Sequence, residues 1–227
     1  MATEMSETTN SQLLINAIRQ KYPDKIGQYF FKSCGGEWIV VLEKTDGTIT
    51  TQSRLLPDDR NKQFAKYRAD KLTVVDIIYK FNPNKTTDQI CNTFFGSHTV
   101  KYIKGSIVVP NSFDQNIDKV CSYGIHFYER IEPAFYLELE KVENGKWTAW
   151  YDSGQKEVEI EYLNGKYSGK WTKWYYGGQI WSEREYLNGE KHGKWTERYD
   201  NGQIQSETEY LTETEYLNGE KHIKLTK

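Results

Sequence analysis

The sequence predicts an α+β N-terminal domain followed by an all-β, single-layer antiparallel meander of hairpin repeats. One observation is a 24-residue period in the C-terminal third, and a second is a mixture of helix and strand signals without any repeat in residues 11–140. A third is composition. Aromatic residues make up 15% of the chain although hydrophobic residues make up only 37%, as is typical of thin β-structures in which Trp and Tyr cover area.

The N-terminal domain is expected to begin with an amphipathic helix at 11–22, because Leu14, Ala17 and Ile18 share one stripe. A second helix is expected to open at Glu132-Pro133, with proline at its first position. Residues 63–80 carry both strand and helix signals. The remaining expected elements are strands at about 26–32, 37–43 and 48–53, the last two joined at Asp46-Gly47, a hairpin at 98–109, and a strand after Gly124. Residues 1–10 are expected to form a disordered tail.

The repeats are expected over 141–227, as three hairpins and a degraded terminal cap. The segments 145-GKWTAWYDSGQ-155, 169-GKWTKWYYGGQ-179 and 193-GKWTERYDNGQ-203 recur at a constant step. Each contains a turn signal, at Ser153-Gly154, Gly177-Gly178 and Asn201-Gly202, which suits a two-residue hairpin loop. Asn164-Gly165 and Asn188-Gly189 mark the connections between repeats.

The hairpin register follows from these loops. It places Lys170 opposite Glu185 and Tyr186 opposite Gly169, with equivalent pairs in the other two hairpins. Strand alternation then gives each hairpin an aromatic face and a charged face. The aromatic face is expected to carry Trp147, Tyr151, Tyr162, Trp171, Tyr175, Arg184, Tyr186, Trp195, Tyr199 and Tyr210. The charged face is expected to carry Lys146, Glu159 and Glu161 with their equivalents.

The pattern G-K-W-x-x-W-Y-x-x-G-Q followed by E-x-E-Y-x-N-G resembles the variant MORN repeat (membrane occupation and recognition nexus), over about residues 141–227. The resemblance implies a single-layer meander and a binding or scaffolding role. The stretch 108-VVPNSFDQNIDKVCSYGIHFYERIEPAFY-136 resembles an uncharacterised domain found beside such repeats in mimivirus-like giant viruses. That second resemblance implies no activity.

One local constellation suggests catalysis. Cys121 and His126 would form a nucleophile–base pair if their side chains met, but no third orienting group is identifiable. The alternative, purely structural interpretation is a cysteine in a turn followed by a histidine packed within a strand. The scattered histidines and the absence of a CxxC pair argue against zinc. The glutamate rows of the charged face are read as solvated rather than as calcium ligands. We therefore expect a non-enzyme without metal or other cofactor.

The expected function is protein–protein interaction or scaffolding through the aromatic face, at Trp147, Tyr151, Trp171, Tyr175, Arg184, Trp195 and Tyr199. The partner would be an unidentified host or viral protein, and an open sheet edge makes a homodimer a further candidate. Two alternatives remain open: an N-terminal cysteine-dependent enzyme targeted by the repeats, and a membrane-surface adaptor. The net charge of −2 disfavours nucleic acid. The absence of a signal peptide or membrane-length apolar run predicts a cytoplasmic location, in the host cell if the protein is viral.

Overall fold

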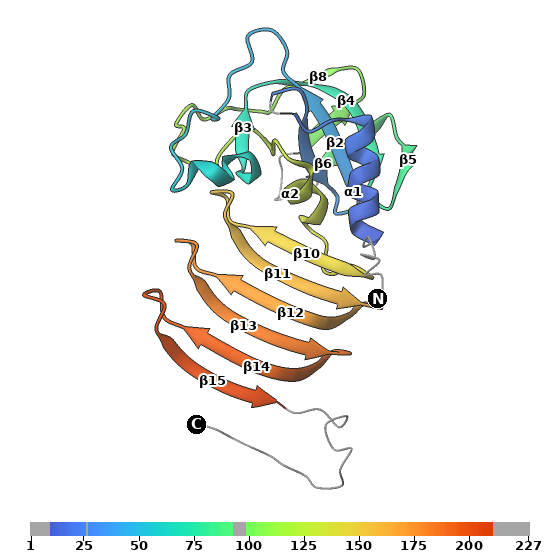
Figure 1. Ribbon diagram of the computed structural model, residues 1–227. Coiled ribbons are helices and arrows are strands. Elements are labelled where there is room, and N and C mark those ends of the chain that lie inside the picture. Colours follow the sequence, from blue (N-terminus) through green and yellow to red (C-terminus); the bar gives the residue numbers. More distant parts are fainter. Residues whose placement is uncertain (1–9, 26, 93–98, 211–227) are drawn as a thin grey trace, which may run out of the picture. The chain divides into compact units, whose positions relative to one another are not determined.

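The computed structural model of the chain describes residues 10–25, 27–92 and 99–210 (Figure 1). Residues 1–9 of the tail expected at 1–10 and the expected terminal cap after Tyr210 lie outside these residues, while Asn10 begins a helix. The described chain forms two compact units. One unit comprises residues 12–140 together with the turn 150–155, and the other comprises, among the described residues, 10–11, 141–149 and 156–210.

The first unit is mostly β-structure. Its main sheet has the order β1-β2-β4-β5, with β8 also paired to β4, and two smaller sheets pair β3 with β9 and β6 with β7. Two α-helices and one 3₁₀ helix accompany the sheets. The elements are α1 (Asn10–Lys21), β1 (Phe30–Cys34), β2 (Trp38–Glu43), η1 (Asp59–Phe64), β3 (Tyr67–Ala69), β4 (Leu72–Tyr79), β5 (Asn82–Thr86), β6 (Gln89–Asn92), β7 (Val100–Ile103), β8 (Ile107–Val108), β9 (Ile125–Phe127) and α2 (Ile131–Tyr136).

The core of this unit is built from the inward faces of β1, β2 and β4. Phe30, Val40, Leu42 and Ile77 are fully buried, and the ring of Phe127 on β9 lies 4.7 Å from that of Phe30. Helix α1 buries Ile18 completely. Removal of this apolar surface from water is the main stabilisation of the unit.

Two expected elements of this unit are wrong. Residues 48–53 form no strand beside β2, because β2 is already paired on both edges, with β1 and with β4; Thr50 makes only an isolated bridge to Ala69. The hairpin expected at 98–109 is not formed by its described residues, 99–109, since β7 pairs with β6 and β8 pairs with β4. The second helix begins at Ile131, so that Pro133 is its third residue.

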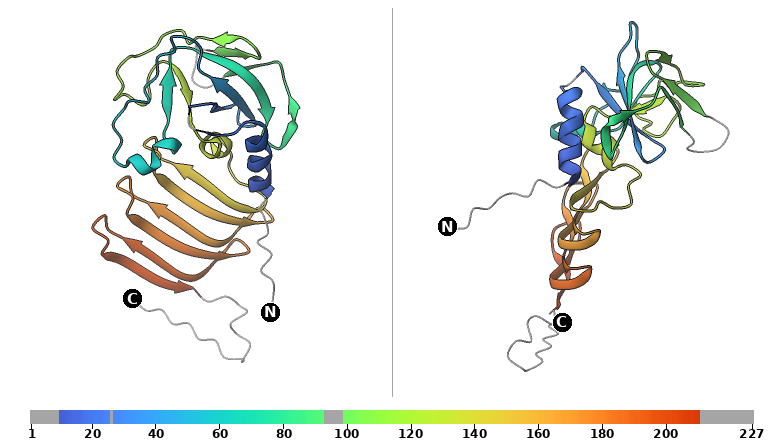
Figure 2. Two further views of the ribbon diagram at one scale, coloured as in Figure 1. Left: turned by 45° about the horizontal axis from the view of Figure 1, so that its top comes forward. Right: turned by 90° about the vertical axis from the view of Figure 1, so that its right-hand side faces the viewer.

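The second unit is a six-stranded antiparallel meander in which every strand pairs with its sequence neighbour. Figure 2 shows it edge-on as a single layer. This confirms the expected meander. Its strands are β10 (Gly145–Trp150), β11 (Lys156–Leu163), β12 (Lys166–Trp174), β13 (Ile180–Leu187), β14 (Glu190–Arg198) and β15 (Ile204–Tyr210).

The hairpin register agrees with the prediction, but the loops do not. Lys170 lies opposite Glu185, Gly169 opposite Tyr186, and the third hairpin repeats both pairs. The loop, however, has three residues: Tyr175 N–H donates to Gln179 O at 2.8 Å, and Gly178 N–H donates to Tyr175 O at 2.8 Å. Trp181 is then left unpaired as a bulge between Ile180 and Ser182. The extra loop residue and the bulge offset each other, which preserves the register along the strands.

The Asn-Gly connections are two-residue turns. Asn164 and Gly165 both have positive φ, of 51° and 69°, and so do Asn188 and Gly189. Positive φ at both central residues is the type I′ geometry, which matches the twist of paired strands. These turns make each connection between repeats a hairpin of its own.

Candidate functional site

The aromatic face of the array carries a continuous line of rings across five strands. Successive ring centroids lie 4.9–5.2 Å apart. The interplanar angles of 53–58° show that the rings are tilted against one another, a favourable arrangement for aromatic pairs. In order across the sheet, the rings are Tyr162, Tyr167, Tyr186, Trp195 and Tyr210.

Cations lie on these rings. The guanidinium of Arg184 lies 4.6 Å from the ring of Trp171 and 5.0 Å from the ring of Trp195, so that it contacts one indole from each of two repeats. Lys191 lies 4.6 Å from the Trp195 ring and 4.9 Å from the ring of Tyr210. Each cation–ring contact contributes roughly 0.5–1 kcal/mol at an exposed site.

The Arg184 side chain is also oriented by hydrogen bonds. Its Nε donates to Ser182 Oγ at 3.1 Å, and its Nη2 donates to Glu197 Oε1 at 2.9 Å. Ser182 is fully buried between the neighbouring side chains. The guanidinium is therefore held in one plane against the indoles rather than extended into solvent.

The expected binding residues are partly accessible. The rings of Trp171, Tyr175 and Trp195 and the side chain of Arg184 are half-buried, as are Trp147 and Tyr151. Tyr199 is exposed, and Tyr162 is buried. The rings thus pack against each other, and most of them still present surface to solvent.

Sequence reasoning missed Tyr167 and Lys191, which continue the line through the connecting hairpins. Both occupy the same repeat position, two residues after the Asn-Gly turn. Register arithmetic on that turn would have found them, because a two-residue loop places Tyr167 opposite Tyr162 and Lys191 opposite Tyr186. Lys173, another cation of this face, lies 4.5 Å from the ring of the bulged Trp181.

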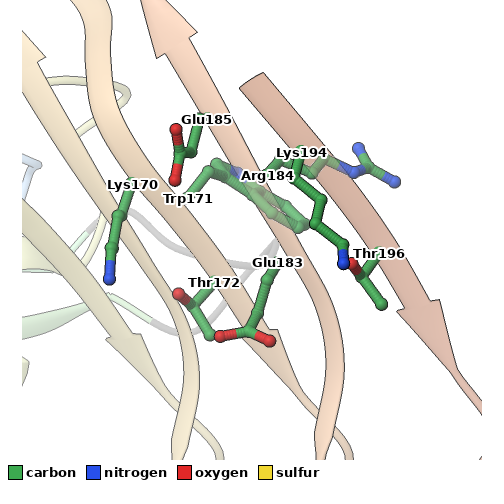
Figure 3. Close-up of a pocket in the computed structure, with 8 residues that line it drawn as sticks. All are labelled: Lys170, Trp171, Thr172, Glu183, Arg184, Glu185, Lys194 and Thr196. Atoms are coloured by element: carbon green, nitrogen blue, oxygen red, sulfur yellow. The ribbon is translucent and has the colours of Figure 1, made fainter. Parts of the chain in front are cut away.

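The charged face contains a hollow of about 140 Å³, which Figure 3 shows in close-up. Eight residues of β12, β13 and β14 line it. Strand alternation places six of them on the charged face, while Trp171 and Arg184 belong to the aromatic side. The six are Lys170, Thr172, Glu183, Glu185, Lys194 and Thr196.

Glutamate and threonine alternate across this face in one row. Glu159 lies opposite Thr172, Thr172 opposite Glu183, Glu183 opposite Thr196, and Thr196 opposite Glu207. Lysines neutralise this row in part, since Lys146 pairs with Glu159 at 3.1 Å and Lys194 with Glu207 at 2.7 Å. Among the described residues no group of three His, Cys, Asp or Glu side chains is arranged to hold a metal ion.

The second glutamate row supports the backbone. The carboxylate of Glu161 accepts the N–H of Lys170 at 3.2 Å, beside a bulge in β12. A Cβ on Gly169 would lie only 2.2 Å from that carboxylate, and a Cβ on Gly193 only 2.5 Å from the carboxylate of Glu185. The recurring glycines therefore make room for recurring glutamates.

Cys121 and His126, the candidate catalytic pair, have other partners. His126 Nε2 lies 3.3 Å from the carbonyl oxygen of Val120, and burial together with Lys66 and Lys32 lowers the pKa of this imidazole to about 4. The thiol of Cys121 is exposed and lies 3.4 Å from Asp152 Oδ2 and 3.7 Å from Lys66 Nζ. The structure thus groups the thiol with a carboxylate and an ammonium instead of an imidazole.

Comparison with known families agrees with both resemblances at the level of the domain. Residues 143–164, 167–188 and 191–211 match the MORN repeat variant. No curated protein and no solved structure matches the chain. The giant-virus origin stays a prediction. No helix among the described residues has the length and apolar character needed to cross a bilayer. Residues 18–134, more than half of the chain, match the family of unknown function DUF5758, and the chain therefore belongs to that family.

Proposed function

We propose that this chain is a non-catalytic protein-interaction module that binds an acidic, partly apolar segment of a partner protein on its aromatic face. This proposal rests on the position of the Arg184 guanidinium between the rings of Trp171 and Trp195, and on the position of Lys191 over the Trp195 ring. Half-buried Trp, Tyr and Arg are the residue types that dominate binding energy in protein interfaces. A rigid sheet presents them with little loss of side-chain freedom on binding.

Charge favours an acidic partner. Lys173, Arg184 and Lys191 lie on the aromatic face, against the single acid Glu197 among its central residues. Glutamates concentrate on the opposite face, in the two rows described above. A partner with carboxylates spaced among apolar side chains would pair with the cations and cover the rings, which is the complementarity that steers association.

MORN repeats commonly serve as protein- or membrane-interaction modules. Of these two roles we propose the first, because three cations interleaved with rings and opposed by Glu197 are few for attraction to an anionic lipid surface. Binding to anionic vesicles is accordingly an outcome that the experiment must distinguish.

The test is selection of peptides from a random display library on the full-length chain, followed by affinity measurement on purified variants. We expect enrichment of acidic residues interspersed with aromatic or aliphatic ones. Trp195→Ala should raise the Kd of a selected peptide tenfold or more, as expected for a hot-spot ring. Lys191→Glu should raise it as well, with a loss of salt dependence.

Lys194→Ala is the matched control, because Lys194 is the neighbour of Trp195 and points to the charged face. It should leave the Kd within about twofold. Equal losses in Trp195→Ala and Lys194→Ala, or selection of basic peptides, would exclude binding on the aromatic face. Vesicle binding that depends on Trp195, without peptide selection, would replace the protein partner by a membrane surface.

A further inference from the structure

A buried lysine lies in the N-terminal unit, outside the repeats. Lys80 directly follows β4, and its side chain is fully buried. Its Nζ donates to Ser33 Oγ at 2.9 Å and to the carbonyl oxygen of Leu137 at 2.9 Å. Both acceptors are uncharged, and burial of an ammonium is costly unless an anion compensates for it.

The compensating anion is the carboxylate of Glu138. Its Oε2 accepts the backbone N–H of Gly36 at 2.8 Å and the hydroxyl of Ser33 at 3.1 Å. Glu138 therefore shares Ser33 with Lys80, in a chain that runs from ammonium to hydroxyl to carboxylate. Two donors from the β1–β2 hairpin thus bind the carboxylate, and Lys80, from the end of β4, is linked to it through Ser33 Oγ.

The two sides of this contact differ in how they are held. Ser33 lies on β1, which is paired along its length with β2, and Lys80 N–H donates to Glu37 O at 2.8 Å. Glu138 is exposed and lies in an irregular segment after α2. Its φ of 67° is in the left-handed region, which a residue with a side chain rarely adopts. The donors are thus fixed by the sheet, whereas the carboxylate is held at a strained position.

We propose that Ser33 Oγ, the Gly36 amide and Lys80 form a carboxylate-binding site, and that Glu138 occupies it as an internal ligand which a carboxylate of a polypeptide partner replaces. One N–H and one O–H already bind a carboxylate oxygen at hydrogen-bond distance, and the ammonium behind them supplies the charge. Replacement would also release the strained backbone of Glu138. This site is independent of the aromatic face, so either proposal can fail alone.

The charge of Lys80 makes binding depend on pH. Burial lowers the pKa of Lys80 to about 7, against the opposing effect of Glu138. Cys34 on β1 is the other titratable group facing the ammonium, and burial raises the pKa of its thiol to about 11, so that it stays neutral across this range. The positive charge is present below about pH 7 and is lost above it. Affinity for a carboxylate should therefore fall as the pH rises through neutrality.

The experiment uses the full-length chain with Glu138→Ala and follows the Gly36 amide by ¹H–¹⁵N NMR during titration with acetate. We expect a saturable shift of this resonance in Glu138→Ala and none in the unmodified protein, whose site is filled. Glu140→Ala, which removes another exposed carboxylate of the same segment, should behave like the unmodified protein. Absence of a saturable shift in Glu138→Ala, or an equal shift in all three proteins, would overturn the proposal.

Further measurements on this variant identify which groups determine carboxylate binding. Adding Ser33→Ala to Glu138→Ala should weaken acetate binding about tenfold or more, as expected for loss of a hydrogen bond to a charged group. Raising the pH from 6 to 8 should also weaken acetate binding, because Lys80 loses its charge as the pH rises. A peptide with a free C-terminus and an amidated peptide with one internal glutamate then show which carboxylate competes with acetate. Inorganic phosphate that binds as tightly as acetate, or failure of both peptides, would refute the assignment to a polypeptide carboxylate.

Discussion

At the scale of the residue, single side chains in the N-terminal unit organise long stretches of chain. Arg68 is almost fully buried, and its two terminal nitrogens donate to four backbone carbonyls, those of Asp114, Asn116, Lys119 and Tyr123. One guanidinium thus supplies the donors for a loop that has few backbone bonds of its own. Nothing in the local sequence around Arg68 indicates this role, because its partners lie some 50 residues further on.

Asp76 on β4 has a similar role and a measurable pH signature. It is 1% exposed and accepts hydrogen bonds from Lys104 Nζ at 2.7 Å, Tyr22 Oη at 2.6 Å and Lys21 Nζ at 2.9 Å. Burial alone would raise the pKa of this carboxyl, but the three donors together with the N–H of Ile77 hold it well below its usual value. We expect Asp76→Asn to lower the free energy of unfolding by about 2–4 kcal/mol at neutral pH.

The sign of the pH effect follows from the lowered pKa. The contribution of Asp76 is complete above its unfolded pKa of about 4 and is lost as the pH falls toward the folded value. The stability difference between the unmodified protein and Asp76→Asn should therefore narrow below about pH 4 in denaturant titrations. Asp46→Asn, in an exposed turn, is the control and should change stability little. A difference that stays constant down to pH 2 would rule out this account.

Two glycines at the same repeat position offer a matched test of a close approach. A Cβ on Gly154 would lie 2.2 Å from the backbone oxygen of Asn61, whereas Gly202 has nothing within 4 Å; their φ values of 90° and 82° are alike. Both alanine variants bear the cost of positive φ, about 1 kcal/mol. Only Gly154→Ala adds a backbone clash, so we expect it to destabilise the protein by at least about 2 kcal/mol more in denaturant unfolding. Equal losses of stability in the two variants would show that the turn at Gly154 accommodates the added Cβ without a cost in free energy.

At the scale of the element, strands that pair with their sequence neighbours could be predicted, whereas strands that pair with distant segments could not. The strands of the array were predictable because each pairs with its neighbour and the turns lie between them. The aromatic and charged faces followed from alternation alone. In the N-terminal unit, β8 pairs with β4 across more than 30 residues and β3 pairs with β9 across more than 50. No signal within 98–109 shows that its two strands go to different sheets.

The residues of the candidate sites divide in the same way into those that could be predicted and those that could not. The rings from Trp147 to Tyr199 were assigned to one face because they recur at a fixed step. The carboxylate cluster was not found, since Ser33, Lys80 and Glu138 are scattered along the sequence and meet only in the fold. Cys121 and His126 are close in sequence, but the Cys121 thiol is exposed to solvent and the His126 ring lies beside the carbonyl oxygen of Val120.

The type I′ turns give an element-scale prediction. Asn188 has a φ of 53°, while Asn201, in the three-residue loop, is not in the left-handed region. Asn188→Ala should destabilise the β13–β14 hairpin by about 1 kcal/mol, since alanine adopts this conformation less readily than asparagine. Hydrogen exchange of β13 and β14 amides should accelerate accordingly. Asn201→Ala should have a smaller effect on these amides; the reverse order would contradict the turn assignment.

At the scale of the whole molecule, the boundary between the two units does not follow the boundary of the repeats. The first repeat loop, residues 150–155, belongs to the same compact unit as 12–140. Arg54 and the N–H of Lys66 both donate to Asp152 O, at 2.9 and 3.1 Å. The ring of Trp150 stacks 5.6 Å from that of Phe64. The corresponding loops of the second and third repeats are exposed.

This sharing predicts how the chain tolerates truncation. A fragment ending at residue 140 loses the hydrogen bonds to Asp152 and the stacked ring of Trp150, and leaves the buried guanidinium of Arg54 without that acceptor, which is costly. A fragment ending at 163 keeps all of them. We therefore expect the shorter fragment to melt several degrees lower by circular dichroism. A fragment ending at 187 adds only strands of the other compact unit, so it should raise the melting of 12–140 little further. Equal melting of the fragments ending at 140 and 163 would mean that the N-terminal unit is complete without the loop, and that the first repeat is a member of the array like the others.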